Sequence, residues 1–289
     1  MADKDLSEKV LIELPDVFAD IYNSLVFKGI KVLKPENLRQ IATENISNPG
    51  GRGLKQQFRD VVMENVVTGL RYMILAIENQ SQVDRTMPLR GMGMDYAEYE
   101  KQIRLLNAGK KTRHGTRKRK LQKAWKKKKQ YQLQQGKLLI PVITLILYYG
   151  AKDWSGPKSL HEMIQMPDEN MYPGVRKYIH DYGMNLVVLK DLNQEEEELF
   201  VSDFRLLVRY LRNCNDPVRQ MELMRQGDDL DHRKETMMAM AALTRDERYT
   251  ALAGKEEENL VAVICNMIQE CGTGCTSEMI YEELFQAIR

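Results

Sequence analysis

Histidine and cysteine are scarce in this chain, which has only four of each among its 289 residues. The histidines are scattered, and the stretch HEMIQ at 161–165 lacks the second histidine of a zinc-protease helix. The cysteines fit reduced thiols better than a disulfide framework, and the last three lack a fourth ligand at tetrahedral zinc spacing. Catalysis by histidine and a zinc site are therefore unsupported. The cysteines are Cys214, Cys265, Cys271 and Cys275.

Long apolar runs are also missing. No window approaches the roughly 18 to 20 uninterrupted apolar residues of a membrane span, and the longest run, LLIPVITLILYYG at 138–150, is strand-like. The charged start MADKDLSEKV has no apolar region of the kind that a secretory signal carries. The segment NPGGRGLK at 48–55 is rich in glycine but lacks the Gly-Lys-Ser/Thr ending of a phosphate-binding loop. With 43% hydrophobic and 29% charged residues, we expect a globular cytoplasmic protein that does not contact a membrane.

Charges of both signs are abundant but segregated. The net charge is only +2, yet residues 110–129 hold twelve basic side chains and no acid, whereas acids cluster at 193–200, 226–232 and 255–259. A basic block of this density attracts polyanions through counterion release, which indicates contact with nucleic acid. The alternatives are a solvated insertion or, in a eukaryote, a nucleolar address. The candidate nucleic-acid contacts in the block are Lys110, Lys111, Arg113, Arg117, Lys118, Arg119, Lys120, Lys123, Lys126, Lys127, Lys128 and Lys129.

Hydrophobic spacing predicts an α/β fold, in which a mixed sheet is flanked by helices and a helical C-terminal region follows. We expect a first domain at 1–193, with a basic insertion at 108–137, and a helical region at 194–289. The Met-rich stretch ETMMAMAAL in that region reads most simply as core. The expected helices lie at 14–29, at 94–107 and in several stretches after Gln194, and the expected strands lie at 56–67, 70–80, 137–150 and 185–192.

The stretch LAIENQSQVD at 75–84 is an apolar run that ends in polar groups. Alternate residues of a strand share a face, so Glu78 and Gln80 point to one side. The preceding strand carries Asp60, and a two-residue turn at Thr68-Gly69 would set Asp60 opposite Ile77. A three-residue turn, Thr68-Gly69-Leu70, would instead set it opposite Glu78. In that second register the two carboxylates would repel unless they share a cation, and Mg²⁺ or Mn²⁺ suits such oxygen ligands.

This pattern resembles the PD-(D/E)XK nuclease superfamily, in which an Asp at the start of one strand and a Glu-x-Lys on the next bind metal and position the attacking water. The stretch Glu78-Asn79-Gln80, followed by Ser81 and by MPLR at 87–90, is similar to the recombination-promoting nuclease (Rpn), or transposase-like, branch. The resemblance extends to PDVFADIYNSLVF at 15–27, RDVV at 59–62 and IPVITLILYYGAKDWSGPKSL at 140–160. It covers roughly residues 10 to 210 and implies a restriction-endonuclease-like core. The combination is far more specific than any one motif.

The resemblance assigns roles to individual residues. Asp60 and Glu78 match the metal-binding carboxylates, and Gln80 stands where the lysine usually lies. An amide cannot supply the positive charge of a lysine, which implies slower or more conditional cleavage. The accessory acid of the opening helix matches Asp16 best, with Asp20 and Glu13 as alternatives.

The sequence allows two interpretations for each of three further features. Arg90 either contacts a phosphate or pairs with an acid such as Asp84. Singly, Asp60 and Glu78 could be ordinary polar residues at strand edges. The aromatic residues Tyr148, Tyr149 and Trp154 fit core positions better than base-stacking ones.

Two functional classes follow from the resemblance and the charge pattern. The first is a Mg²⁺- or Mn²⁺-dependent DNA endonuclease linked to recombination or mobile elements. Nucleases of this kind often act as homodimers, so the resemblance also implies a homodimer. The second is a weak or inactive DNA-binding relative of the same fold, as Gln80 suggests. A third class, an interaction module built on the helical C-terminal region, also fits the acidic last third of the chain.

Overall fold

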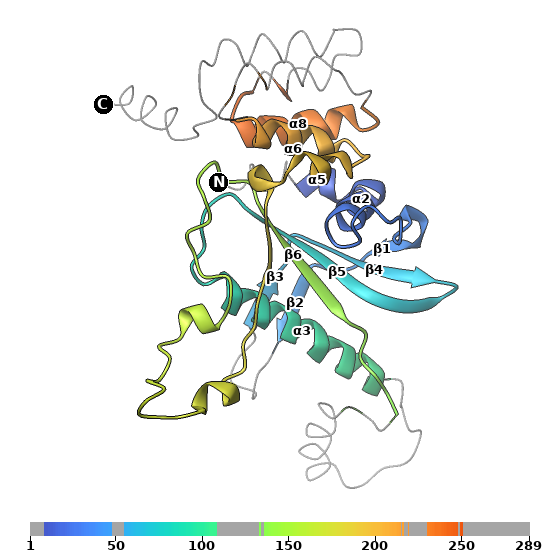
Figure 1. Ribbon diagram of the computed structural model, residues 1–289. Coiled ribbons are helices and arrows are strands. Elements are labelled where there is room, and N and C mark those ends of the chain that lie inside the picture. Colours follow the sequence, from blue (N-terminus) through green and yellow to red (C-terminus); the bar gives the residue numbers. More distant parts are fainter. Residues whose placement is uncertain are drawn as a thin grey trace, which may run out of the picture.

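A computed structural model describes residues 9–47, 55–108, 133, 136–214, 216, 219, 230–247 and 249–250. The basic block at 110–129 and Cys265, Cys271 and Cys275 lie outside these residues. The predicted α/β class is confirmed, because a mixed five-stranded sheet is flanked by helices (Figure 1). None of the helices in the described ranges is long and apolar enough to cross a membrane.

The sheet has the order β1-β4-β5-β6-β7. Strands β1, β4 and β5 pair antiparallel, whereas β5, β6 and β7 pair parallel. Two further strands, β2 and β3, form a small antiparallel sheet of their own. The bounds are β1 Leu38–Gln40, β2 Glu44–Ser47, β3 Lys55–Phe58, β4 Val61–Val67, β5 Leu70–Gln80, β6 Val142–Tyr148 and β7 Asn185–Val188.

Helices cover both faces of the sheet, and Figure 1 shows α2, α5, α6 and α8 together on one side and α3 on the other. The first face carries Leu75, Ile77, Leu145 and Leu147, which share one core with all four of those helices or their flanking loops. The helices are α2 Pro15–Leu25, α3 Met87–Ala108, α5 Gln194–Glu198, α6 Phe204–Arg212 and α8 Arg233–Thr244. Short 3-10 turns lie at Pro35–Asn37, His161–Met163, Val175–Tyr178 and Leu189–Asp191.

The opposite face of the sheet supports α3. Its apolar side chains form two smaller clusters, one of which joins Met87 and Met94 of α3 to Ile146 and Tyr148 of β6. The other cluster contains Val62, Ile74 and Ala76. Since Ala76 and Ile77 point in opposite directions along β5, Glu78 lies on the face that α3 covers.

Several predicted elements have different bounds in the structure. The strand expected at 56–67 is divided at Arg59-Asp60, so that β3 joins the small sheet and β4 the large one. Helix α3 begins at Met87 instead of residue 94. The strand expected at 185–192 ends at Val188, and the stretch EEELFVSDFRLLVRYLRN at 196–213, whose spacing predicts one helix, is broken between α5 and α6.

The aromatic residues at the end of β6 belong to the core, as predicted. Tyr148, Tyr149 and Trp154 are all buried, and the rings of Tyr148 and Trp154 meet edge to face at 5.1 Å. A Cβ at Gly150 would collide with the ring of Tyr148, so a larger residue there would displace a ring that is part of the core. The prediction for the Met-rich helix is also confirmed, because Met237 and Met240 are fully buried.

Candidate functional site

The β4–β5 hairpin sets Asp60 opposite Glu78. Strand pairing ends at Val61 opposite Ile77, so the next position of β5 faces the residue that precedes β4. The predicted register is therefore confirmed, but its predicted cause is wrong. The turn has two residues, Thr68 and Gly69, with φ of 50° and 80°. A bulge between Asn65 and Val66 then moves the register by one residue.

The two carboxylates are held by backbone N–H groups from each other's segment. The amide of Asn79 donates to Oδ2 of Asp60 at 2.7 Å, and the amide of Asp60 donates to the Glu78 carboxylate. Glu78 is only 2% exposed. Its Oε1 atom is buried and accepts no hydrogen bond from the residues that the structure describes. A buried oxygen in this state is costly, and a bound cation would relieve that cost.

The pKa of the Glu78 carboxyl is raised to about 8, first by burial and then by the negative charge of Asp60, against opposing effects from Arg59 and Arg90. At neutral pH the pair therefore tends to hold one proton. A divalent cation between the carboxylates would displace that proton and accept the lone pairs of the buried oxygen.

A buried polar network lies beside this pair, and no sequence motif indicated it. Arg59 is 2% exposed and donates to Oγ1 of Thr144 at 2.9 Å and to Oδ1 of Asp95 at 2.7 Å. Thr144 and Tyr182 donate to the same carboxylate of Asp95, each at 2.7 Å. Asp95 also raises the pKa of the Tyr182 hydroxyl, after burial as the main cause.

The network fixes the carboxylate site relative to α3 and β6. Thr144 pairs in register with Ala76, one side-chain row before Glu78 on the same face of the sheet. The Arg59 guanidinium is therefore a permanent positive charge beneath the carboxylate pair. The only sequence signal for it is a charged residue directly before Asp60. Asp95, Thr144 and Tyr182 lie too far along the chain for any local pattern to connect them.

Arg90 and Gln80 are both close to the pair along the chain. Arg90 forms a salt bridge with Asp84 at 2.5 Å, so the second of its two interpretations, pairing with an acid, is the one that the structure has. Burial raises the pKa of Asp84, but hydrogen bonds from Thr86 and Arg90 outweigh that effect and lower it. Gln80 follows Glu78 on the same face and is half-buried, and its carbonyl accepts from the Tyr149 amide at 2.8 Å.

The structure does not bring the accessory acid to the site. Asp16 lies on α2, which packs on the other face of the sheet, and its Oδ2 lies 2.6 Å from Nε2 of His232. The alternatives are also engaged elsewhere. Asp20 is buried and accepts from the amides of Val201 and Ser202, and Glu13 pairs with Lys9.

The candidate metal site therefore consists of Asp60 and Glu78 alone. No group of three or more His, Cys, Asp or Glu side chains suited to a metal occurs among the residues with described positions. Two carboxylates are nevertheless enough for Mg²⁺, which keeps several of its waters and is often bound through one or two carboxylates plus substrate phosphate. The buried, unpartnered Oε1 of Glu78 fits such an ion.

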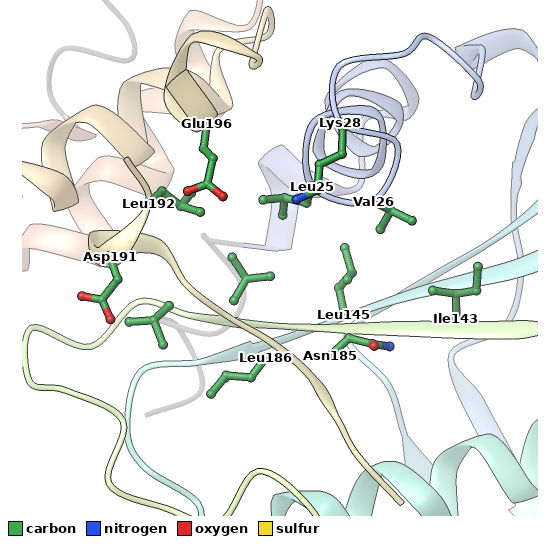
Figure 2. Close-up of a pocket in the computed structure, with 12 residues that line it drawn as sticks. Leu25, Val26, Lys28, Ile143, Leu145, Asn185, Leu186, Asp191, Leu192 and Glu196 are labelled. Carbon is green, nitrogen blue, oxygen red and sulfur yellow. The ribbon is translucent and has the colours of Figure 1, made fainter. Parts of the chain in front are cut away.

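A separate pocket of about 540 Å³ lies on the opposite face of the sheet. Figure 2 shows its apolar wall of β6 and β7 side chains, including Ile143 and Leu145, with Lys28 and Glu196 on the side of the helical elements. None of the candidate site residues lines it. The pocket is thus distinct from the carboxylate pair. Its lining is completed by Leu25, Val26, Asn185, Leu186, Val187, Val188, Asp191 and Leu192.

Comparisons of this chain with protein-family models, with curated proteins and with solved structures find no match.

Proposed function

We propose that this protein is a metal-dependent endonuclease that hydrolyses DNA phosphodiester bonds, with a restriction-endonuclease-like core and a role in recombination or mobile-element biology. The observation that carries the proposal is the opposition of two carboxylates, Asp60 and Glu78, one of which has a buried oxygen without a partner. Asp60 directly precedes β4 and Glu78 lies near the end of β5, which is the placement that the PD-(D/E)XK resemblance implies.

In this proposal Asp60 and Glu78 hold one Mg²⁺ or Mn²⁺. When bound, such an ion polarises a phosphate oxygen and lowers the pKa of a coordinated water. The backbone amides of Asn79 and Asp60 fix the directions of the two carboxylates. The positive charges of Arg59 and Arg90 both offset part of the repulsion between the carboxylates, and Gln80 follows Glu78 on the same face of β5.

Nicking of supercoiled plasmid tests the proposal. We expect nicking in Mg²⁺ or Mn²⁺ but not in EDTA. Glu78→Gln and Asp60→Asn should lower the rate by about two orders of magnitude or more, because each removes a charged ligand without changing side-chain volume. A matched control is Glu98→Gln, which neutralises another buried acid, one that pairs with Lys101 on α3. Metal-independent nicking, or nicking that survives both substitutions, would refute the proposal.

A DNA-binding protein with little or no nuclease activity is the second candidate. Gln80 in place of a lysine favours it, as does the engagement of Asp16 by His232 away from the pair. In that case the wild-type protein shifts labelled DNA in a gel but does not nick plasmid in either metal. The plasmid assay therefore separates the two functions.

A further inference from the structure

The connection between β6 and β7, residues 149–184, contains an exposed segment at 171–178, called the tip below. Met171, Tyr172 and Tyr178 are 70%, 56% and 72% exposed. Three large side chains at this level of exposure within eight residues make the tip a candidate contact surface. Tyr148, Tyr149 and Trp154, for which the sequence favoured core positions over base stacking, are all buried. The tyrosines that reach solvent are different ones.

The tip also carries positive charge. Arg176 and Lys177 are exposed, and within the described parts of the chain neither forms a salt bridge. The Lys177 ammonium lies 5.1 Å from the centre of the Tyr178 ring. A ring with a cation at this distance gives a surface that attracts phosphates and stacks on bases.

Four of the five acids of the same connection accept hydrogen bonds from its own backbone, and the fifth, Asp153, pairs with Lys190. Glu169 accepts from the Gly174 amide at 2.5 Å, and Asp168 accepts from the Asn170 amide at 2.8 Å. Glu162 accepts from the Lys158 amide, and Asp181 from the His161 and Tyr182 amides. These carboxylates stabilise turns at the base of the tip, while residues 170–180 contain no acid. The outer surface is therefore aromatic and basic.

The connection is fixed to the carboxylate site. Tyr182, which follows the tip, donates to Asp95 of the Arg59 network, and a Cβ at Gly91 of α3 would lie 3.5 Å from its ring. Figure 1 shows the connection, in yellow-green, beside the start of α3 on the face of the sheet that bears Glu78. A polymer held by the tip thus lies on the same side of the molecule as Asp60 and Glu78.

We propose that the tip at 171–178 binds an unpaired DNA strand, with bases stacked on Tyr172 and Tyr178 and phosphates beside Arg176 and Lys177. The choice of DNA as the polymer rests on the proposed function. An unpaired strand fits better than a duplex because stacking on an exposed ring requires a free base face. The same surface would hold a strand that leads toward the carboxylate pair.

Binding of a fluorescent single strand of mixed sequence, in EDTA and at physiological salt, tests this inference on the full chain. We expect Tyr172→Ala/Tyr178→Ala to weaken binding at least about tenfold, and the corresponding Phe variant to bind like the wild type, because phenylalanine keeps the stacking face. Tyr72→Ala is a matched control, since Tyr72 is 49% exposed on the distant β4–β5 hairpin. Duplex of the same sequence should be affected less.

The charges of the tip are tested by Arg176→Ala/Lys177→Ala. Loss of two phosphate contacts should reduce the steepness of the salt dependence of single-strand binding by about 1.4 in log–log slope. The basic block at 110–129 also binds DNA if the sequence prediction holds, so a positional measurement is needed. A strand containing 5-bromouracil should crosslink under ultraviolet light to Tyr172 or Tyr178, as located by mass spectrometry.

Unchanged affinity in the Tyr→Ala variant, or crosslinks only outside the tip, would overturn the inference. A loss in the Phe variant equal to that in the Ala variant would also overturn it, because the hydroxyls and not the rings would then carry the binding. The measurements need no cleavage. A chain that fails to nick plasmid but loses strand binding in the Ala variant would refute the nuclease and leave the tip assignment intact.

Discussion

At the residue scale, Glu78 is a buried carboxyl that favours its protonated form, and in the proposed function a divalent cation would compete with this proton. Its pKa is raised from 4.5 to about 8 in the folded chain, mainly through burial. Between these values the folded state keeps a proton that the unfolded state releases, so folding stability falls as pH rises from about 4.5 to 8. At about 1.4 kcal/mol per pKa unit, the full loss amounts to as much as about 5 kcal/mol.

Glu78→Gln should therefore flatten this dependence. Urea unfolding at pH 5 and pH 8.5 should show a large difference in the free energy of unfolding for the wild type and a much smaller one for the variant. Mn²⁺ should raise the melting temperature of the wild type at pH 8.5, because the ion binds only the folded pair, and should not do so for Glu78→Gln. Equal pH dependence in the two proteins would contradict the burial argument.

Residue-level prediction from the sequence was strongest where a motif is local. Glu78, Gln80 and Asp60 lie on two adjacent strands, and their alternation is enough to place Glu78 and Gln80 on one face. The register was right although the turn was misjudged, because a bulge at Asn65/Val66 supplied the shift assigned to a longer turn. Asp95 and Tyr182 could not be predicted, because their contact with Arg59 depends on how α3 and the β6–β7 connection pack.

At the element scale, Asp16, the expected accessory acid of the metal site, instead links α2 to the start of α8. His232 directly precedes α8, and its ring lies 2.6 Å from Asp16 on α2. Burial lowers the pKa of His232, but the hydrogen bond and charge of Asp16, with the charges of Asp203 and Glu235, outweigh this and raise it. The resulting stabilisation is fully present below the unfolded pKa of about 6.5. It is lost as pH rises through the folded pKa.

We expect His232→Gln to remove this pH dependence. The effect is small, about 0.5 kcal/mol, because the side chains of His232 and Asp16 are 28% and 43% exposed and solvent screens the pair. Proton NMR titration of the His232 ring should give a pKa above that of a free histidine in the wild type and a lower one in Asp16→Asn. An identical titration in both would show that Asp16 does not stabilise the charged ring.

Elements were predicted well where apolar periodicity was long and poorly where polar residues interrupt it. The run at 137–150 gave β6, and the helical spacing of 14–29 gave α2. The strand expected at 56–67 was divided because Arg59 turns into the buried network and Asp60 toward Asn79. The break between α5 and α6 follows from Ser202, whose amide and hydroxyl bind the Asp20 carboxylate.

At the scale of the whole molecule, the sheet and the helices after residue 193 share one hydrophobic core. Phe200, Phe204 and Met240 belong to the same buried cluster as Phe18 of α2 and Ile77 of β5. One buried carboxylate, Asp20, joins α2 to this helical region, and a second, Asp203, joins two segments within it. Asp20 accepts hydrogen bonds from the segment before α6, and Asp203 accepts from the amides of Asp231 and His232 before α8. The helices therefore complete the core on the face opposite Glu78.

A chain that ends at residue 193 should consequently not fold by itself, because its core would lose Phe200, Phe204 and Met240 and leave apolar side chains of α2 and the sheet exposed. In the full chain, Asp20→Ala should lower the free energy of unfolding by about 1 to 3 kcal/mol, as expected when buried donors lose their acceptor. Asp191→Ala, at an exposed acid of the same region, is the control. Circular dichroism and urea unfolding measure both effects. If the truncated chain is folded and monomeric, and Asp20→Ala is as stable as the control, the helical region is a separate unit and the shared core contributes little to stability.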